Sequence, residues 1–165
     1  MYYLKSYYTW PKLASVSNAS ERLLSCHTEP AYETKATNLF NRIVSSLDNP
    51  KRKDGALGYF GLGVMAADRY LNGNQPEWQK SVDYMAKALD RDPQFTSARA
   101  SRALLFAERA RLSPSSSQEP EVNKAVAEWQ QFKRIKGLPK RQLDYADDRI
   151  SKLRTRDFER LSQTC

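Results

Sequence analysis

Apolar side chains recur along most of this chain at the three- and four-residue spacing of α-helices. The clearest stripe lies over residues 77–90, where the apolar positions follow at intervals of four, three and four: Trp78, Val82, Met85 and Leu89. That spacing places them on one face of a helix. Two small residues, Ser81 and Ala88, lie beside this face, where another helix could approach closely. The pattern predicts an amphipathic helix over 77–90.

The same spacing predicts five further helices, which are expected over 30–47, 56–71, 95–112, 121–135 and 141–162. Proline or glycine stands at most of the joints, where each interrupts a helix. The joints are mostly short, which favours antiparallel neighbours, and Ser113–Pro120 is predicted to be a flexible polar loop. No segment has the alternation of a strand bounded by turn residues. The predicted fold class is therefore all-α.

The helix over 56–71 is apolar on more than one side, so we expect it to be central. Gly61 and Gly63 lie within it, and each would cost about 1 kcal/mol relative to alanine in a helix. We interpret both glycines as positions where neighbouring helices approach closely.

The helical hairpins between residues 55 and 135 resemble tetratricopeptide repeats, which are built from 34-residue helix–turn–helix units. Four residues have the offsets that the second half of a repeat prefers: Ser81, Met85, Ala88 and Pro93. Leu62-Gly63 resembles the Leu-Gly pair of the first half, and Ala103 and Phe106 keep the small-then-aromatic offset. The sequence departs from the pattern at Arg102, which stands where leucine is usual.

This resemblance implies a short right-handed solenoid of helical hairpins with a core over about 55–135. The helices over 30–47 and 141–162 would then cap its two ends. Another small α-helical bundle is the alternative fold. The resemblance also implies that the helix over 95–112 is the first helix of a repeat, which lines the concave surface in this family.

The length of 165 residues favours one domain, over 30–165, preceded by an aromatic-rich segment over 1–29. Five rings crowd the first ten positions: Tyr2, Tyr3, Tyr7, Tyr8 and Trp10. They are expected to dock on this protein's own core or on a partner. No window is apolar enough to span a bilayer, and the start lacks the features of a secretory signal. A cytoplasmic location is favoured, and a periplasmic one would require a signal that had been removed.

The net charge of +8 is concentrated near the C-terminus, because residues 131–165 carry ten basic and five acidic residues. A basic cluster surrounds the turn at Gly137: Lys133, Arg134, Lys136, Lys140 and Arg141. Such a cluster could contact phosphates, so a nucleic-acid-associated or ribonucleoprotein subunit is an alternative function. Acidic residues are mixed among the following cations, which instead favours a salt-bridged exposed helix face.

Candidate catalytic chemistry is sparse. The chain has one histidine, His27, and two cysteines, Cys26 and Cys165, which could be free thiols or a disulfide. Their spacing offers neither a zinc site nor a nucleophile–base pair. We therefore expect no enzymatic activity, no metal site and no cofactor.

Arginines and phenylalanines share an arc of the helix over 95–112, where Arg99, Arg102 and Arg109 interleave with Phe95 and Phe106. Arginine forks could clamp an acidic peptide or helix while the rings hold its apolar side chains. The predicted binding residues are Tyr59, Phe60, Arg99, Arg102, Phe106 and Arg109. Alternatively, the arginines pair with carboxylates of neighbouring helices and the phenylalanines belong to the core.

The sequence thus predicts a protein–protein interaction adaptor, scaffold or assembly subunit. Bacterial secretion and pilus machines use small helical-repeat proteins of this kind, so such a machine is a candidate setting by analogy with the fold. A purely structural subunit within a larger assembly is a further alternative, which the aromatic N-terminal segment would suit.

Overall fold

The computed structural model describes residues 30–46 and 54–158, and this part of the chain is all-α, with no strand. It contains six α-helices and one short 3-10 helix: α4 (Pro30–Ser46), α5 (Asp54–Leu71), α6 (Glu77–Arg91), α7 (Thr96–Leu112), η1 (Ser115–Ser117), α8 (Gln118–Lys133) and α9 (Lys140–Thr155). The predicted all-α class is confirmed for these ranges. None of these helices is long and apolar enough to cross a membrane.

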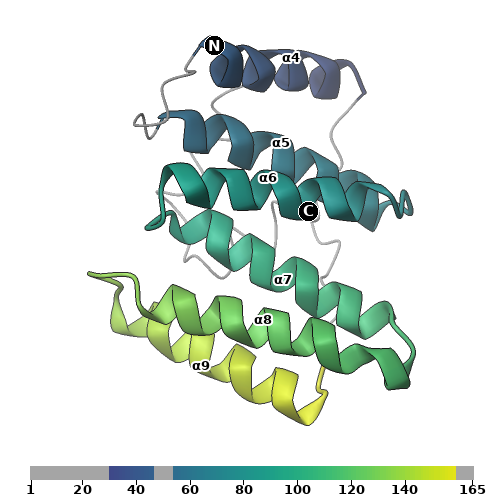
Figure 1. Ribbon diagram of the computed structural model, residues 1–165, viewed down its shortest axis with the longest axis vertical. Coiled ribbons are helices and arrows are strands. Elements are labelled where there is room, and N and C mark those ends of the chain that lie inside the picture. Colours follow the sequence, from purple (N-terminus) through teal and green to yellow (C-terminus); the bar gives the residue numbers. More distant parts are fainter. Residues whose placement is uncertain (1–29, 47–53, 159–165) are drawn as a thin grey trace.

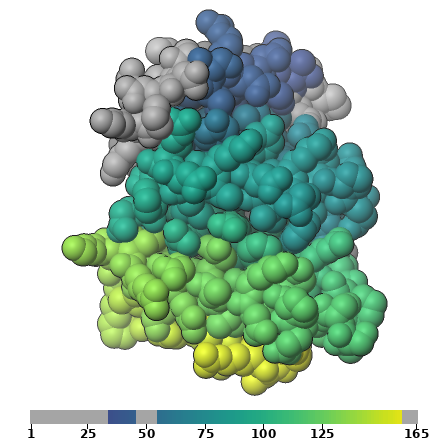
Figure 2. Space-filling model, viewed as in Figure 1, coloured from purple at the N-terminus to yellow at the C-terminus, as the bar shows by residue number. Residues whose placement is uncertain are grey.

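Neighbours in sequence are also neighbours in space. Figure 1 shows the helices following one another down the long axis, and Figure 2 shows the same order as successive bands of colour. Packing is most extensive between α5 and α6 and between α7 and α8. Each of these pairs is joined by a short connection, so each forms an antiparallel hairpin. Helix α4 packs on α5 at one end, and α9 packs on α8 at the other.

Two predicted boundaries were wrong. Helix α8 begins at Gln118, so that Pro120 lies in its first turn rather than before it. Proline is tolerated there because the first N–H groups of a helix have no intrahelical partner. Part of the expected flexible loop is therefore helical.

Helix α9 was predicted to extend to residue 162 but ends at Thr155. Arg156 takes a left-handed conformation with φ of 60°, and its N–H donates to the carbonyl of Leu153. The N–H of Asp157 donates to the carbonyl of Lys152. Helices that end with this hydrogen-bond pattern usually have glycine at the left-handed position. Here that position is occupied by arginine, so the sequence does not indicate the end of the helix.

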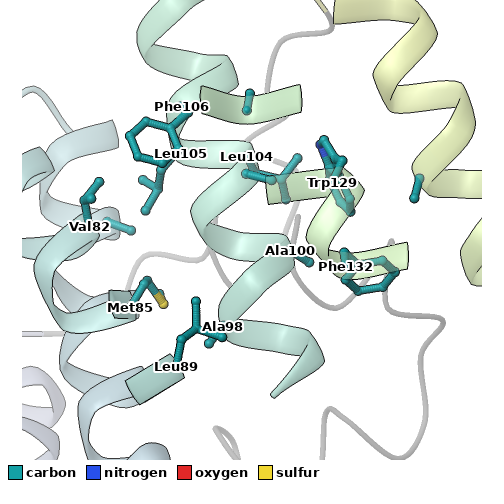
Figure 3. Close-up of a cluster of buried hydrophobic side chains, with 14 of the residues drawn as sticks. Val82, Met85, Leu89, Ala98, Ala100, Leu104, Leu105, Phe106, Trp129 and Phe132 are labelled. Carbon is teal, nitrogen blue, oxygen red and sulfur yellow. The ribbon is translucent and has the colours of Figure 1, made fainter. Parts of the chain in front are cut away.

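The main core lies on both sides of α7, as Figure 3 shows. Alanines at 98, 100, 103 and 110 are fully buried, and their small side chains allow α6 and α8 to approach α7 from two directions. From α6, Met85 reaches this core with no exposed surface. From α8, Trp129 and Phe132 pack edge to face at 5.5 Å.

Glycines on α5 permit two close helix contacts. A Cβ at Gly61 would lie 2.4 Å from the ring of Phe40 on α4, and one at Gly63 would lie 2.9 Å from the Cε atom of Met85 on α6. The Ser81 hydroxyl, fully buried, donates a hydrogen bond of 2.7 Å to the carbonyl of Gly63. The interpretation of both glycines as positions of close approach is confirmed.

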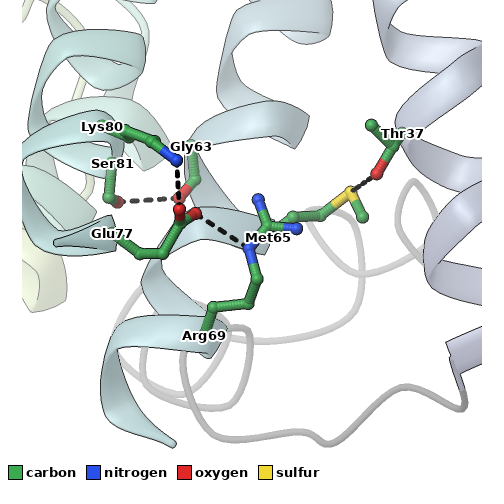
Figure 4. A network of polar contacts seen from close by, with 7 residues as sticks. All are labelled: Thr37, Gly63, Met65, Arg69, Glu77, Lys80 and Ser81. Atoms are coloured by element: carbon green, nitrogen blue, oxygen red, sulfur yellow. Dashed lines mark hydrogen bonds and ion pairs between the residues drawn. The ribbon is translucent and has the colours of Figure 1, made fainter. Parts of the chain in front are cut away.

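A buried carboxylate fixes the start of α6, as Figure 4 shows. Glu77 is 5% exposed; it accepts a hydrogen bond of 2.8 Å from Arg69 of α5 and another from Lys80. Burial acts to raise the pKa of Glu77, but the hydrogen bonds from Lys80 and Arg69 outweigh it and hold that pKa below its ordinary value. Glu77 therefore stays ionised at neutral pH and ties α5 to α6.

Candidate partner-binding site

The two predicted phenylalanines belong to the core. Phe60 and Phe106 are 7% and 5% exposed. Phe60 packs against Phe95 at 5.0 Å, and Phe106 packs edge to face on Trp78 at 5.9 Å. Assigning their rings to an open binding surface was therefore wrong, because neighbouring helices already cover them. Apolar spacing identifies a face of a helix but not which neighbour covers it.

Arg99 and Arg102 converge on a single carboxylate from the next helix. Glu128 of α8 pairs with Arg99 at 3.1 Å and with Arg102 at 3.3 Å. The three side chains are only 16%, 26% and 12% exposed, so water screens them less than it screens surface pairs. This ion pairing is the alternative that the sequence left open. Two guanidinium groups on one carboxylate nevertheless leave one positive charge in excess.

Arg109 is held without a counter-ion. Its guanidinium donates a hydrogen bond of 3.1 Å to the neutral side chain of Gln75 and lies 5.2 Å from the centre of the Trp78 ring. It forms no ion pair within the described part of the chain. Burial raises the pKa of Tyr70, and the hydrogen bond and the charge of Arg109 act against that rise.

These groups form a continuous surface, here named the α7 seam, where α7 lies between α6 and α8. It consists of Gln75, Trp78, Arg99, Arg102, Arg109, Glu121, Lys124 and Glu128, which surround the buried ring of Phe106. Lys124 pairs with Glu121 at 2.9 Å, and its ammonium lies 5.6 Å from the Phe106 ring. Four cations against two carboxylates leave two positive charges in excess.

The residues of the α7 seam differ from the binding residues that the sequence predicted. The resemblance implied that α7 would present the arginines on a concave face. In the structure they contact side chains of α6, of the turn before it and of α8. Sequence reasoning assigned Trp78 to a core stripe and did not select Lys124 or Glu128. No local signal could have found these residues, because only the packing of separate helices brings them to the arginines.

Tyr59 lies apart from these arginines. Its ring stacks on Tyr84 of α6 at 6.4 Å, and the ammonium of Lys87 lies 5.8 Å from it. Arg91 also approaches this ring, at 5.9 Å. The contacts of Tyr59 are therefore made with residues of α6 other than Trp78.

The basic cluster at the α8–α9 turn divides into paired and unpaired cations. Lys133 pairs with Asp147, and Lys140 pairs with Asp144 at 2.8 Å. That hydrogen bond raises the pKa of Lys140. The other three cations, Arg134, Lys136 and Arg141, are exposed and form no ion pair among the described residues. Their charges remain available to a ligand.

Chemistry-bearing groups are otherwise few in the ranges that the structure covers. No cluster of histidine, cysteine, aspartate or glutamate there could hold a metal ion. Cys26, His27 and Cys165 lie outside the described residues. A cavity of about 30 Å³ lies between α7, α8 and α9, and this volume suits one or two waters.

The residues that carry the resemblance to tetratricopeptide repeats occupy packing positions. Ser81, Met85 and Ala88 are fully buried where α6 meets its neighbours, and Pro93 follows the end of α6. Any amphipathic hairpin would bury such positions, so their burial does not single out this family. Comparison with protein-family models, curated proteins and solved structures found no match to the chain.

Proposed function

We propose that this protein is a non-enzymatic scaffold that binds an acidic segment of a partner protein along the α7 seam. Its helical hairpins would be arranged as in tetratricopeptide repeats. The observation that carries the proposal is the uncompensated charge of the seam, which lies beside the half-buried ring of Trp78. Protein interfaces are rich in arginine and aromatic residues, which carry much of the binding energy.

The geometry of the arginines favours a carboxylate ligand. Guanidinium groups bind carboxylates through two parallel hydrogen bonds, and such charge-assisted bonds are stronger than neutral ones. Glu128 already holds Arg99 and Arg102 in place, so a ligand would lose less entropy in ordering them. Arg109, which is held by Gln75 and Trp78, is ordered in the same way.

Ion pairs within the protein explain some of the arginines of the seam without any partner protein. Glu128 pairs with both Arg99 and Arg102, as a structural role would require, but neutralises only one of their two charges. It does not account for Arg109, whose hydrogen-bond partner is a neutral amide. A guanidinium that lies over a tryptophan ring and forms no ion pair within the described residues is better explained by a ligand that carries a carboxylate.

The test compares two variants with the same change in net charge. Arg102→Glu/Arg109→Glu reverses the seam, whereas Arg134→Glu/Arg141→Glu reverses the α8–α9 turn. Each tagged protein is purified from its native cells with and without nuclease, and co-purifying proteins are quantified by mass spectrometry. We expect a defined protein that survives nuclease treatment and is lost in the seam variant alone. Retention of that protein by the folded seam variant would contradict the proposal.

A second candidate function is nucleic-acid binding at the α8–α9 turn. It is favoured by Arg134, Lys136 and Arg141, which are exposed and form no ion pair within the described ranges. Three phosphate contacts on a single strand give a salt dependence with a logarithmic slope of about −2. Binding of random single-stranded RNA with that slope, lost in Arg134→Glu/Arg141→Glu, would support it. A partner protein that stays bound at high salt and after nuclease treatment would oppose nucleic-acid binding as the function.

A further inference from the structure

The excess charge of the seam is held at two points along α7. Glu128 is shared by Arg99 and Arg102, and Arg102 lies over the Phe106 ring at 5.7 Å. Arg109 lies over Trp78. Arg102 and Arg109 are seven residues apart on one helix, which corresponds to about 10.5 Å along its axis. A ligand that runs parallel to α7 and engages both needs two carboxylates at about this separation along the helix axis.

The separation discriminates between the shapes that a bound segment can take. In a second helix, side chains seven residues apart are also separated by about 10.5 Å and point in nearly the same direction. In an extended segment, side chains on one face are spaced by about 6.6 Å or about 13 Å. Residues three apart in an extended segment span the distance but point to opposite faces. A helix therefore matches the seam better than an extended peptide.

Apolar surface lies between the two charged points. Trp78 is half-buried, and its indole N–H donates to the Leu105 carbonyl, which fixes the ring against α7. On a helix with acidic residues at positions i and i+7, the side chains at i+3 and i+4 project between them on the same face. An apolar residue there would lie against the Trp78 ring.

We propose that the segment bound by the seam is an amphipathic helix of a partner protein, lying along α7. It carries acidic residues seven positions apart and apolar residues at the third and fourth positions between them. This inference rests on the proposed function and adds the secondary structure and charge spacing of the partner. The two carboxylates engage Arg102 and Arg109, and the apolar residues cover Trp78.

Synthetic peptides test the spacing without knowledge of the partner. The matched peptide has an alanine-rich host of about 18 residues, long enough to be partly helical. It carries two glutamates seven positions apart with two leucines between them. An isomer of the same composition has the glutamates five positions apart, which places them on different faces. A third peptide has proline at the centre of the matched sequence, which breaks the helix.

Binding of labelled peptides to the full chain is measured by fluorescence anisotropy. We expect the matched peptide to bind about tenfold more tightly than the isomer, since the isomer loses one charge-assisted contact. The proline peptide should bind as weakly as the isomer or more so. Arg109→Gln should remove the preference while leaving the fold intact, because Arg109 forms no ion pair within the described residues and its contact with Gln75 is exposed. Arg134→Gln/Arg141→Gln, the control, should preserve the preference.

The failure of this inference differs from the failure of the proposed function. Equal binding of the three peptides, or no binding of the matched one at millimolar concentration, would overturn the helical partner. The seam would still be the binding surface if Arg102→Glu/Arg109→Glu abolished capture of the native partner. If that variant captured the partner normally, the proposed function would fail and the inference with it.

Discussion

Replacing Gly61 with alanine tests the close contact between α4 and α5. The added Cβ would lie 2.4 Å from two ring atoms of Phe40, a side chain only 2% exposed. Alanine gains about 1 kcal/mol of helix propensity over glycine. Accommodating the extra methyl group in this packed contact costs about 1–3 kcal/mol. We therefore expect Gly61→Ala to lower the free energy of unfolding by about 0–2 kcal/mol.

The sign of the effect should change when the ring is removed. Phe40→Ala alone should cost about 3–5 kcal/mol, because a buried ring is lost. In that background, Gly61→Ala no longer meets the ring and should stabilise the protein by about 1 kcal/mol. The two substitutions should therefore be coupled by about 1–3 kcal/mol.

Urea denaturation of the four proteins in this cycle measures the coupling. Gly55→Ala is the matched control on the same helix, because the nearest atom to its Cβ would be Cγ of Arg91 at 4.0 Å. The control should be neutral or slightly stabilising in both backgrounds. An equal change in the free energy of unfolding for Gly61→Ala with and without the Phe40 ring would refute a close contact between α4 and α5 at this glycine.

Three further predictions follow from the core, the Glu77 network and the seam. Met85→Ala should lower the free energy of unfolding by about 2–5 kcal/mol in urea, because Met85 is fully buried. The pKa of Glu77 is lower in the folded state than the ordinary carboxyl value of 4.5. Ionised Glu77 therefore stabilises the folded protein above pH 4.5, and this stabilisation is lost as the pH falls through the folded-state pKa. Stability of the wild type should therefore fall more steeply than that of Glu77→Gln between about pH 5 and about pH 3; parallel curves would contradict this. Arg109→Gln should leave the thermal midpoint nearly unchanged yet reduce partner capture, and a large drop in the midpoint would instead give Arg109 a structural role.

Much of the fold could be predicted from helical periodicity. The stripe of Val82, Met85 and Leu89 is buried as the spacing requires, and the glycines of α5 lie at close contacts. The boundaries that failed involve Pro120 and Arg156, where a helix tolerates or uses a residue that usually signals something else. Local sequence does not determine such cases, because the hydrogen bonds of the surrounding turn decide them.

The candidate site could be predicted only in part. Spacing on one helix placed the arginines together, and the structure does hold Arg99 and Arg102 within reach of one carboxylate. No pattern in the chain selects Glu128 as that carboxylate or places Trp78 beside Arg109. These pairings join residues of different helices, so they depend on how the hairpins pack. For the same reason, the burial of Phe60 and Phe106 could not be separated from a role in binding.

The central claim is that a partner covers the α7 seam, and side-chain footprinting of the complex tests it most directly. Hydroxyl radicals oxidise accessible aromatic rings, and Trp78 is half-buried at the seam whereas Trp129 is 1% exposed in the core. Oxidation of Trp78 should slow when the co-purified partner is bound, while that of Tyr84, which lies away from the seam, should not change. Unchanged oxidation of Trp78, with protection of the α8–α9 turn instead, would contradict the account.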